Sequence, residues 1–124
     1  MLAFKLGSTP PALDAWGHPE DIGAETMTGP IQVSGKLVFG TLETPVSGGF
    51  YAASQGCYRV TYPFHEHATL LEGELRLTDV STGQSEIYGP GDSWIIAKGT
   101  TIIWHILSPR ILKSYICATT DLQT

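Results

Sequence analysis

The sequence predicts an all-β protein of one domain, built as an antiparallel sandwich or a closed barrel. Fourteen glycines and eight prolines divide its 124 residues into short pieces. Almost none of these pieces has the spacing of apolar residues that an amphipathic helix requires. Short strand-like segments recur instead, and no helical segment could cover a parallel sheet. Periodicity alone does not separate the sandwich from the barrel.

The residues before the strand-rich region predict an N-terminal arm, and the rest predicts the β domain. Residues 1–35 are rich in Pro, Gly, Asp and Glu, so we expect them to pack on the domain or on a second subunit, with Trp16 as the anchor. Residues 36–124 contain nine strand candidates separated by turn signals such as Glu72-Gly73 and Gly89-Pro90-Gly91-Asp92. In chain order they are 36–43, 49–54, 57–62, 67–72, 74–80, 85–88, 93–97, 101–107 and 110–118.

Alternation within these segments assigns side chains to faces. In 57–62, Tyr58 and Tyr62 share one side with Val60, and in 74–80 Leu75 and Leu77 share one side. One face of each segment should therefore contact a core. Segment 101–107 is apolar on both faces apart from His105, which predicts a central strand buried on both sides.

The composition excludes several classes of partner. Hydrophobic residues make up 42% and charged residues 15% of the chain, and a chain of this length buries roughly two-thirds of its unfolded surface without needing a disulfide or a metal. Seven basic and twelve acidic residues give a formal charge of −5, and no basic stretch could neutralise phosphates. We therefore expect no nucleic-acid partner.

Nothing in the sequence predicts export or a membrane partner. The N-terminus lacks the apolar run and small-residue cleavage site of a signal peptide, and no window approaches the roughly eighteen apolar residues of a membrane span. Cys57 and Cys117 lie in apolar, strand-like segments, where a buried free thiol is commoner than a bridge. We expect a reduced, cytoplasmic protein.

Two stretches resemble the paired motifs of the cupin superfamily. The first, from Gly56 to Gly73, ends in a glutamate, six further residues and the glycine of a Leu-Glu-Gly turn. The second, from Gly89 to Trp104, is similar to the cupin Pro-Gly-Asp turn, short strand and Pro-x-Gly turn. With its continuation through 110–115, the chain most resembles small single-domain cupins related to ureidoglycine aminohydrolase and to the ethanolamine-utilisation cupin.

The resemblance implies the RmlC-like cupin fold, a double-stranded β-helix. This is a jelly-roll barrel whose open mouth holds a small-molecule pocket. Residues 36–124 would form a single cupin barrel, with residues 1–35 as an irregular arm. The resemblance also implies a homodimer, because cupins of this kind pair through edge strands and exchange N-terminal segments.

The resemblance further implies where a metal would bind. In metal-binding cupins, the first motif supplies two histidines and a glutamate, and the second motif supplies another histidine. Glu66 aligns with the ligand glutamate, but Val60 and Tyr62 take the two histidine positions and Ile102 takes the fourth. We therefore predict no cofactor.

The cluster His65-Glu66-His67 leaves a divalent transition metal as an alternative. Strand alternation directs His65 and His67 to the face opposite Glu66, so the three converge only if a bulge intervenes near Pro63. The plainer interpretation is that both histidines are polar side chains bonded to a neighbouring loop or subunit.

Alignment and alternation together direct six side chains into the barrel. Glu66 and Lys113 are the candidate catalytic pair, because they place one acid opposite one base. The structural alternative is that the two merely satisfy each other in the core. The candidate pocket wall is aromatic and consists of Tyr58, Tyr62, Trp104 and Tyr115.

Three functions stay open at this point. The first is a pocket for a small polar metabolite such as a ureide, an amino-acid derivative, an organic acid or a sugar. The second is a metal-dependent cupin enzyme that uses Glu66 with His65 or His67. The third is a non-catalytic dimeric binding or scaffold module. The sequence does not decide whether the protein is an enzyme, because fold does not fix function.

Overall fold

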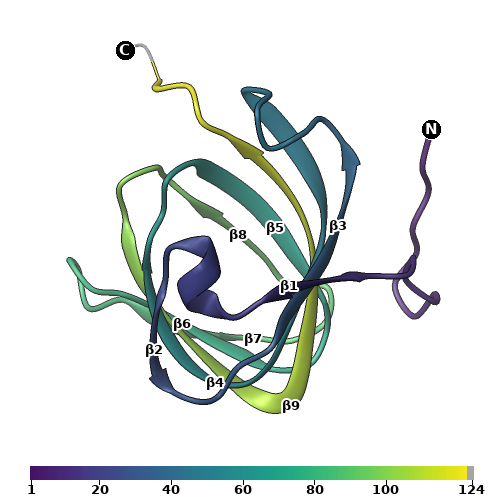
Figure 1. Ribbon diagram of the computed structural model, residues 1–124. Coiled ribbons are helices and arrows are strands. Elements are labelled where there is room, and N and C mark those ends of the chain that lie inside the picture. The colour runs from purple at the N-terminus through teal and green to yellow at the C-terminus, as the bar shows by residue number, and fades with distance from the viewer. Residues whose placement is uncertain (123–124) are drawn as a thin grey trace.

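The computed structural model describes residues 1–122 and confirms the all-β jelly-roll barrel (Figure 1). No α-helix occurs within these residues, and no helix there is long and apolar enough to cross a membrane. The elements are β1 (Asp14–Gly17), the 3-10 helix η1 (Pro19–Ile22), β2 (Glu25–Thr28), β3 (Val33–Phe39), β4 (Val46–Thr61), β5 (His65–Glu72), β6 (Leu75–Asp79), β7 (Ser85–Tyr88), β8 (Ser93–Ile96) and β9 (Thr101–Ala118).

Two long strands, β4 and β9, belong to both halves of the barrel. Residues 46–54 of β4 pair with 110–118 of β9, and residues 56–61 pair with 101–106. Residues 46–54 of β4 and 110–118 of β9 belong to the first sheet, β1-β3-β4-β9-β5-β8. Residues 56–61 of β4 and 101–106 of β9 belong to the second sheet, β2-β4-β9-β6-β7. All of these pairings are antiparallel, and the two sheets enclose the core between their inner faces.

The sequence predicts each of these long strands as two separate ones, and the structure joins them through a bend. In β4 the register shifts between Ser54 and Gly56, as in a β-bulge. Gly56 has φ +155°, and a Cβ there would lie 2.5 Å from the carbonyl oxygen of Thr28. In β9 the predicted Ser108-Pro109 turn falls between the two paired halves, where a proline removes no ladder hydrogen bond.

The predicted faces agree with the observed burial. Tyr58, Tyr62, Leu75 and Leu77 are all buried in the main core. The first half of β9 is central, because it pairs with β4 on one side and β6 on the other. Its inner face is buried, whereas Ile103 on the opposite face is only half-buried, so burial on both sides is partial.

The N-terminal segment contributes to the walls of the barrel mouth. Strand β1 pairs with β3 at the edge of one sheet, and β2 pairs with β4 at the edge of the other. Between them, η1 lies over the opening of the barrel (Figure 1). The Trp16 ring lies so close to Gly35 that a Cβ at Gly35 would overlap it. On the outer face, Phe4 packs edge-on against Phe50 with the ring centroids 5.2 Å apart.

Candidate functional site

A buried ion pair lies on the inner face of the first sheet. In the β5–β9 ladder, Glu66 is opposite Cys117 and Leu70 is opposite Lys113, so alternation directs both charged side chains inward. Lys113 Nζ donates a 2.7 Å hydrogen bond to Glu66 Oε2, and the side chains are only 6% and 1% exposed. Ala68, the small inward residue between Glu66 and Leu70, leaves room for the lysine side chain to reach the carboxylate.

The second oxygen of Glu66 accepts two more hydrogen bonds. The Tyr62 hydroxyl and Trp94 Nε1 both donate to Glu66 Oε1, each at 3.0 Å. Trp104 Nε1 in turn donates to the Tyr62 hydroxyl at 3.2 Å. Buried polar groups are costly unless they are bonded, and every member of this network has a partner. Glu66 is therefore a carboxylate held in one orientation by three donors.

Aromatic rings surround the Lys113 ammonium. Its Nζ lies 4.8 Å from the ring centroid of Tyr51, 4.6 Å from that of Trp104 and 5.2 Å from that of Tyr115. Tyr51 is the direct cross-strand partner of Lys113 in the β4–β9 ladder, which explains the first contact. Cation–π attraction to desolvated rings contributes about 1–2 kcal/mol or more, so the cage stabilises the charged lysine beside Glu66.

The tyrosines around this pair are held in their neutral form. Burial raises the pKa of Tyr58 and of Tyr62 well above the usual value, and the Glu66 charge raises the pKa of Tyr62 further. Burial also raises the pKa of Tyr51 and of Tyr115. The Tyr51 and Tyr58 hydroxyls are 2.9 Å apart and share one hydrogen bond. All four hydroxyls thus keep their protons at neutral pH.

A cavity of about 560 Å³ opens above the ion pair. The structure brings all six sequence-predicted pocket residues, Tyr58, Tyr62, Glu66, Trp104, Lys113 and Tyr115, to its lining. Mostly apolar side chains from the N-terminal segment, from β3 and β4 and from the loops that follow these two strands complete the wall. They include Trp16, Ile22, Leu37, Leu42, Val60 and Phe64.

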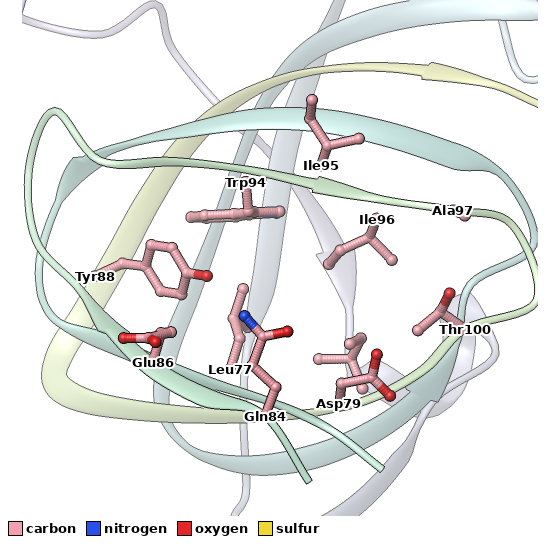
Figure 2. A pocket seen from close by; sticks show the side chains of 11 residues that line it. Leu77, Asp79, Gln84, Glu86, Tyr88, Trp94, Ile95, Ile96, Ala97 and Thr100 are labelled. Atoms are coloured by element: carbon pink, nitrogen blue, oxygen red, sulfur yellow. The ribbon is translucent and has the colours of Figure 1, made fainter. Parts of the chain in front are cut away.

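A second cavity, of about 250 Å³, lies between the edge strands β7 and β8 (Figure 2). Glu86 and Tyr88 face it from β7, Trp94 faces it from β8, and the Asp79 carboxylate lies at its rim. Because Trp94 Nε1 also donates to Glu66, this indole connects the lining of the small cavity to the network at the bottom of the large one. Sequence reasoning did not identify this second cavity.

The histidines of the alternative metal set do not join Glu66. His65 faces away from the barrel interior, and its Nδ1 accepts a 2.9 Å hydrogen bond from the backbone N–H of Lys98, while its Nε2 is buried without a partner among the described residues. His67 is exposed on the outer face of β5, opposite Ile95 and Ile116. From His65 to Leu70 the strand keeps the regular alternation that separates both histidines from Glu66, and its register shifts only after Leu70.

Comparison with known proteins identifies the group to which this barrel is related. The family model described as the EutQ-like cupin domain matches residues 42–115, more than half of the chain. The chain belongs to the EutQ-like cupin family. No curated protein matches it. The resemblance expected from the sequence motifs is thereby confirmed.

Solved structures share the fold of this EutQ-like cupin at low identity. A putative ethanolamine utilization protein Q from Salmonella typhimurium is 20% identical, with a TM-score of 0.59 over 75% of this chain and 72% of that one. The Clostridium difficile EutQ protein is 19% identical, with a TM-score of 0.61 over 74% and 71%. A Pseudomonas syringae protein of unknown function is 19% identical, with a TM-score of 0.71 over 86% of this chain and 44% of that one.

The barrel interior of this EutQ-like cupin does not match the donor set of a metal-binding cupin. At the three positions that the cupin resemblance assigns to histidine ligands, it has Val60, Tyr62 and Ile102, none of which offers a nitrogen ligand. Glu66 is already bonded to three donors. Within residues 1–122, no three His, Cys, Asp or Glu side chains gather as a metal group would require. These residues do not fit a transition metal.

Two residues of the site escaped the sequence reasoning, Tyr51 and Trp94. Tyr51 lies in the run Gly-Gly-Phe-Tyr-Ala-Ala, which is apolar on both faces, and Trp94 lies in the equally ambiguous Trp-Ile-Ile. Only the ladder decides their direction, because Trp94 is opposite Ala68 and Tyr51 is opposite Lys113. Neither pairing has a signal in the local sequence.

Proposed function

We propose that this EutQ-like cupin binds a small polar metabolite in the large cavity, without the usual cupin metal. Glu66 and Lys113 are the pair of charged residues that acts on this ligand. The observation that carries the proposal is a buried ion pair beside an open cavity. Burying two charges costs as much free energy as their attraction returns, so such a pair is weak support for a purely structural role. An acid and a base that line the same cavity can orient a polar ligand or transfer a proton to it.

The proposal assigns different roles to the two charged residues. Both oxygens of Glu66 are occupied, so Glu66 orients Lys113. Lys113 has hydrogen atoms left for a ligand, and it is the proton donor for any reaction of a bound molecule. Tyr58, Tyr62, Trp104 and Tyr115 form the wall against which the ligand packs.

A thermal-shift screen tests the proposal. The panel contains ureides, amino-acid derivatives, organic acids and sugars, together with Fe, Mn, Ni and Zn salts on a chelator-free preparation. A ligand at one hundred times its Kd should stabilise the folded protein by about 2.7 kcal/mol. Its effect should disappear in the double variant Glu66→Gln, Lys113→Met. Stabilisation by a metal with stoichiometric metal content would support the metal-enzyme alternative, and no response to any compound would support the scaffold alternative.

We also propose that the protein is a homodimer that uses the outer face of the first sheet. Phe39, Ile95 and Ile116 are 46%, 81% and 43% exposed there. The ladders place them in one row across the sheet, through His67 and Gly48. Sedimentation should give twice the mass of the chain at micromolar concentration, and Ile95→Asp should reduce it to one chain. A single-chain mass for the unmodified protein would contradict the proposal.

We propose a reducing, cytoplasmic location on the basis of the thiols. Cys57 and Cys117 are both free, and Cys117 is buried beside the Ser47 hydroxyl. Burial raises the pKa of the Cys57 thiol, which makes it less reactive. Fractionation of the cells that make the protein would test the location.

A further inference from the structure

Some polar groups at the bottom of the large cavity carry donor hydrogens that have no hydrogen-bond acceptor. Lys113 Nζ carries three hydrogens, and Glu66 Oε2 takes one of them. No oxygen or nitrogen of the described residues accepts the other two. The remaining neighbours of Nζ are aromatic rings, which are weak acceptors. The bonded hydroxyl pair of Tyr51 and Tyr58 has one further hydrogen to donate.

Three of the roughly four acceptor positions of the Glu66 carboxylate in this region are already used. Glu66 Oε1 accepts from Tyr62 and Trp94, and Oε2 accepts from Lys113. A ligand that enters this region therefore meets hydrogen-bond donors that have no acceptor. A ligand with an acceptor oxygen satisfies them, whereas a ligand that offers only N–H groups leaves these donors without partners.

The charge in this region is already balanced. Glu66 and Lys113 neutralise each other, and both side chains are more than nine-tenths buried. A carboxylate or an ammonium group placed beside them would add an uncompensated charge to a dry environment, which is strongly unfavourable. The third charged residue of the described lining is Asp21 on the exposed η1 segment, and its negative charge at the mouth also disfavours anions.

We infer that the ligand is an uncharged carbonyl compound, whose carbonyl oxygen accepts hydrogen bonds from Lys113 and the Tyr51–Tyr58 pair and whose body packs on the apolar wall. The inference rests on the proposed function and narrows its ligand class. Among the metabolites considered, it selects ureides and neutral amides over organic acids and amines. The wall formed by Trp16, Val60 and Phe64 favours a ligand with an apolar part.

A matched set of four probes tests this inference. Benzamide and acetophenone carry a neutral carbonyl group, benzoate carries a carboxylate and benzylamine carries an ammonium group on a similar ring. Binding is followed by the NMR signal of the Trp104 indole N–H, because Trp104 lines the large cavity. For the unmodified protein, both neutral carbonyl probes should bind at least about tenfold more tightly than benzoate and benzylamine.

Two variants reverse or remove this preference. Glu66→Gln leaves Lys113 as an unbalanced cation, so benzoate should gain about tenfold relative to benzamide. The double variant Glu66→Gln, Lys113→Met removes both charges and the lysine donor together. Benzamide and acetophenone should then bind less than about threefold more tightly than toluene, a fifth probe with a similar ring and no polar group. Glu74→Gln is the matched control, because Glu74 is exposed and lines neither cavity; it should change the benzamide affinity by less than about twofold.

The possible results separate the two proposals. Tighter binding of benzoate or benzylamine than of benzamide to the unmodified protein would overturn the inference and leave a binding pocket in place. An unchanged preference in folded Glu66→Gln would also overturn it. If no probe moved the Trp104 signal, both the inference and the proposed function would be overturned. Circular dichroism of each variant verifies that it is folded.

Discussion

Replacing Lys113 by methionine tests the energetic consequence of the buried ion pair. Lys113→Met removes the cation and leaves the Glu66 carboxylate buried at 1% exposure, with Tyr62 and Trp94 as its remaining donors among the described residues. Breaking a buried pair in this way costs about 3–5 kcal/mol. The free energy of the lost cation–π contacts is already included in this range, so it is not added again.

The double variant Glu66→Gln, Lys113→Met should recover most of this loss. The glutamine still accepts hydrogen bonds from Tyr62 and Trp94, and the methionine fills the space inside the aromatic cage. Because neutral replacements of a buried pair are close to neutral in stability, the double variant should lie within about 1.5 kcal/mol of the unmodified protein. The two substitutions should therefore show a coupling energy of at least about 2 kcal/mol.

Urea unfolding followed by tryptophan fluorescence measures both variants, since Trp94 and Trp104 report on the site itself. For a chain of this length, each kcal/mol corresponds to about 4 °C in Tm, so the single variant should melt roughly 12–20 °C lower. A loss below about 1 kcal/mol for Lys113→Met would refute the reasoning. A double variant as unstable as the sum of the single ones would refute it too.

Two further predictions concern packing and pH. Gly35→Ala should destabilise the protein by about 1–3 kcal/mol in urea unfolding, because the added methyl group overlaps the Trp16 ring. The control Gly89→Ala should cost less than about 0.5 kcal/mol, because the nearest neighbour of its Cβ would be 3.9 Å away. Equal losses of stability in the two variants would contradict this account. Burial raises the pKa of the four cavity tyrosines in the folded protein. Their contribution to the free energy of unfolding is therefore fully present below pH about 10, the ordinary tyrosine pKa. It is lost as the pH rises above about 10 towards the pKa values of the folded protein. Alkaline titration of absorbance at 295 nm should show these tyrosines ionising only together with unfolding, and reversible ionisation of the folded protein near pH 10 would be inconsistent with their burial.

The all-β architecture could be predicted from the sequence because its turns are local signals, and the resemblance of the two motifs to cupins implied the barrel. Gly73 illustrates this, since it adopts φ +94° and a Cβ there would overlap the carbonyl oxygen of Arg110. Alternation predicted the inward direction of Tyr58 and Tyr62, and both line the cavity. These features depend on a few consecutive residues, which is the information that one sequence contains.

The parts that could not be predicted depend on strand pairing over long sequence distances. The contact of Trp94 with Glu66 requires β8 to pair with β5, and the contact of Tyr51 with Lys113 requires β4 to pair with β9. Local sequence does not fix such a register when both faces of a strand are apolar. The bends that join the halves of β4 and β9 have the same origin, because a bulge inside a ladder and a turn between two strands use similar residues.

The ion pair offers a physical account of how a cupin barrel can keep a positive centre without histidine ligands. In metal-binding cupins, the cation beside the glutamate is a divalent metal held by imidazoles. Here the cation beside Glu66 is the Lys113 ammonium, held by one carboxylate and three aromatic faces. A covalently attached ammonium is always present and donates hydrogen bonds in fixed directions, but its single charge is balanced by Glu66. Such a centre suits a neutral carbonyl group rather than the anions that a divalent metal attracts, and treatment with a chelator should leave both the Tm and the binding of benzamide unchanged.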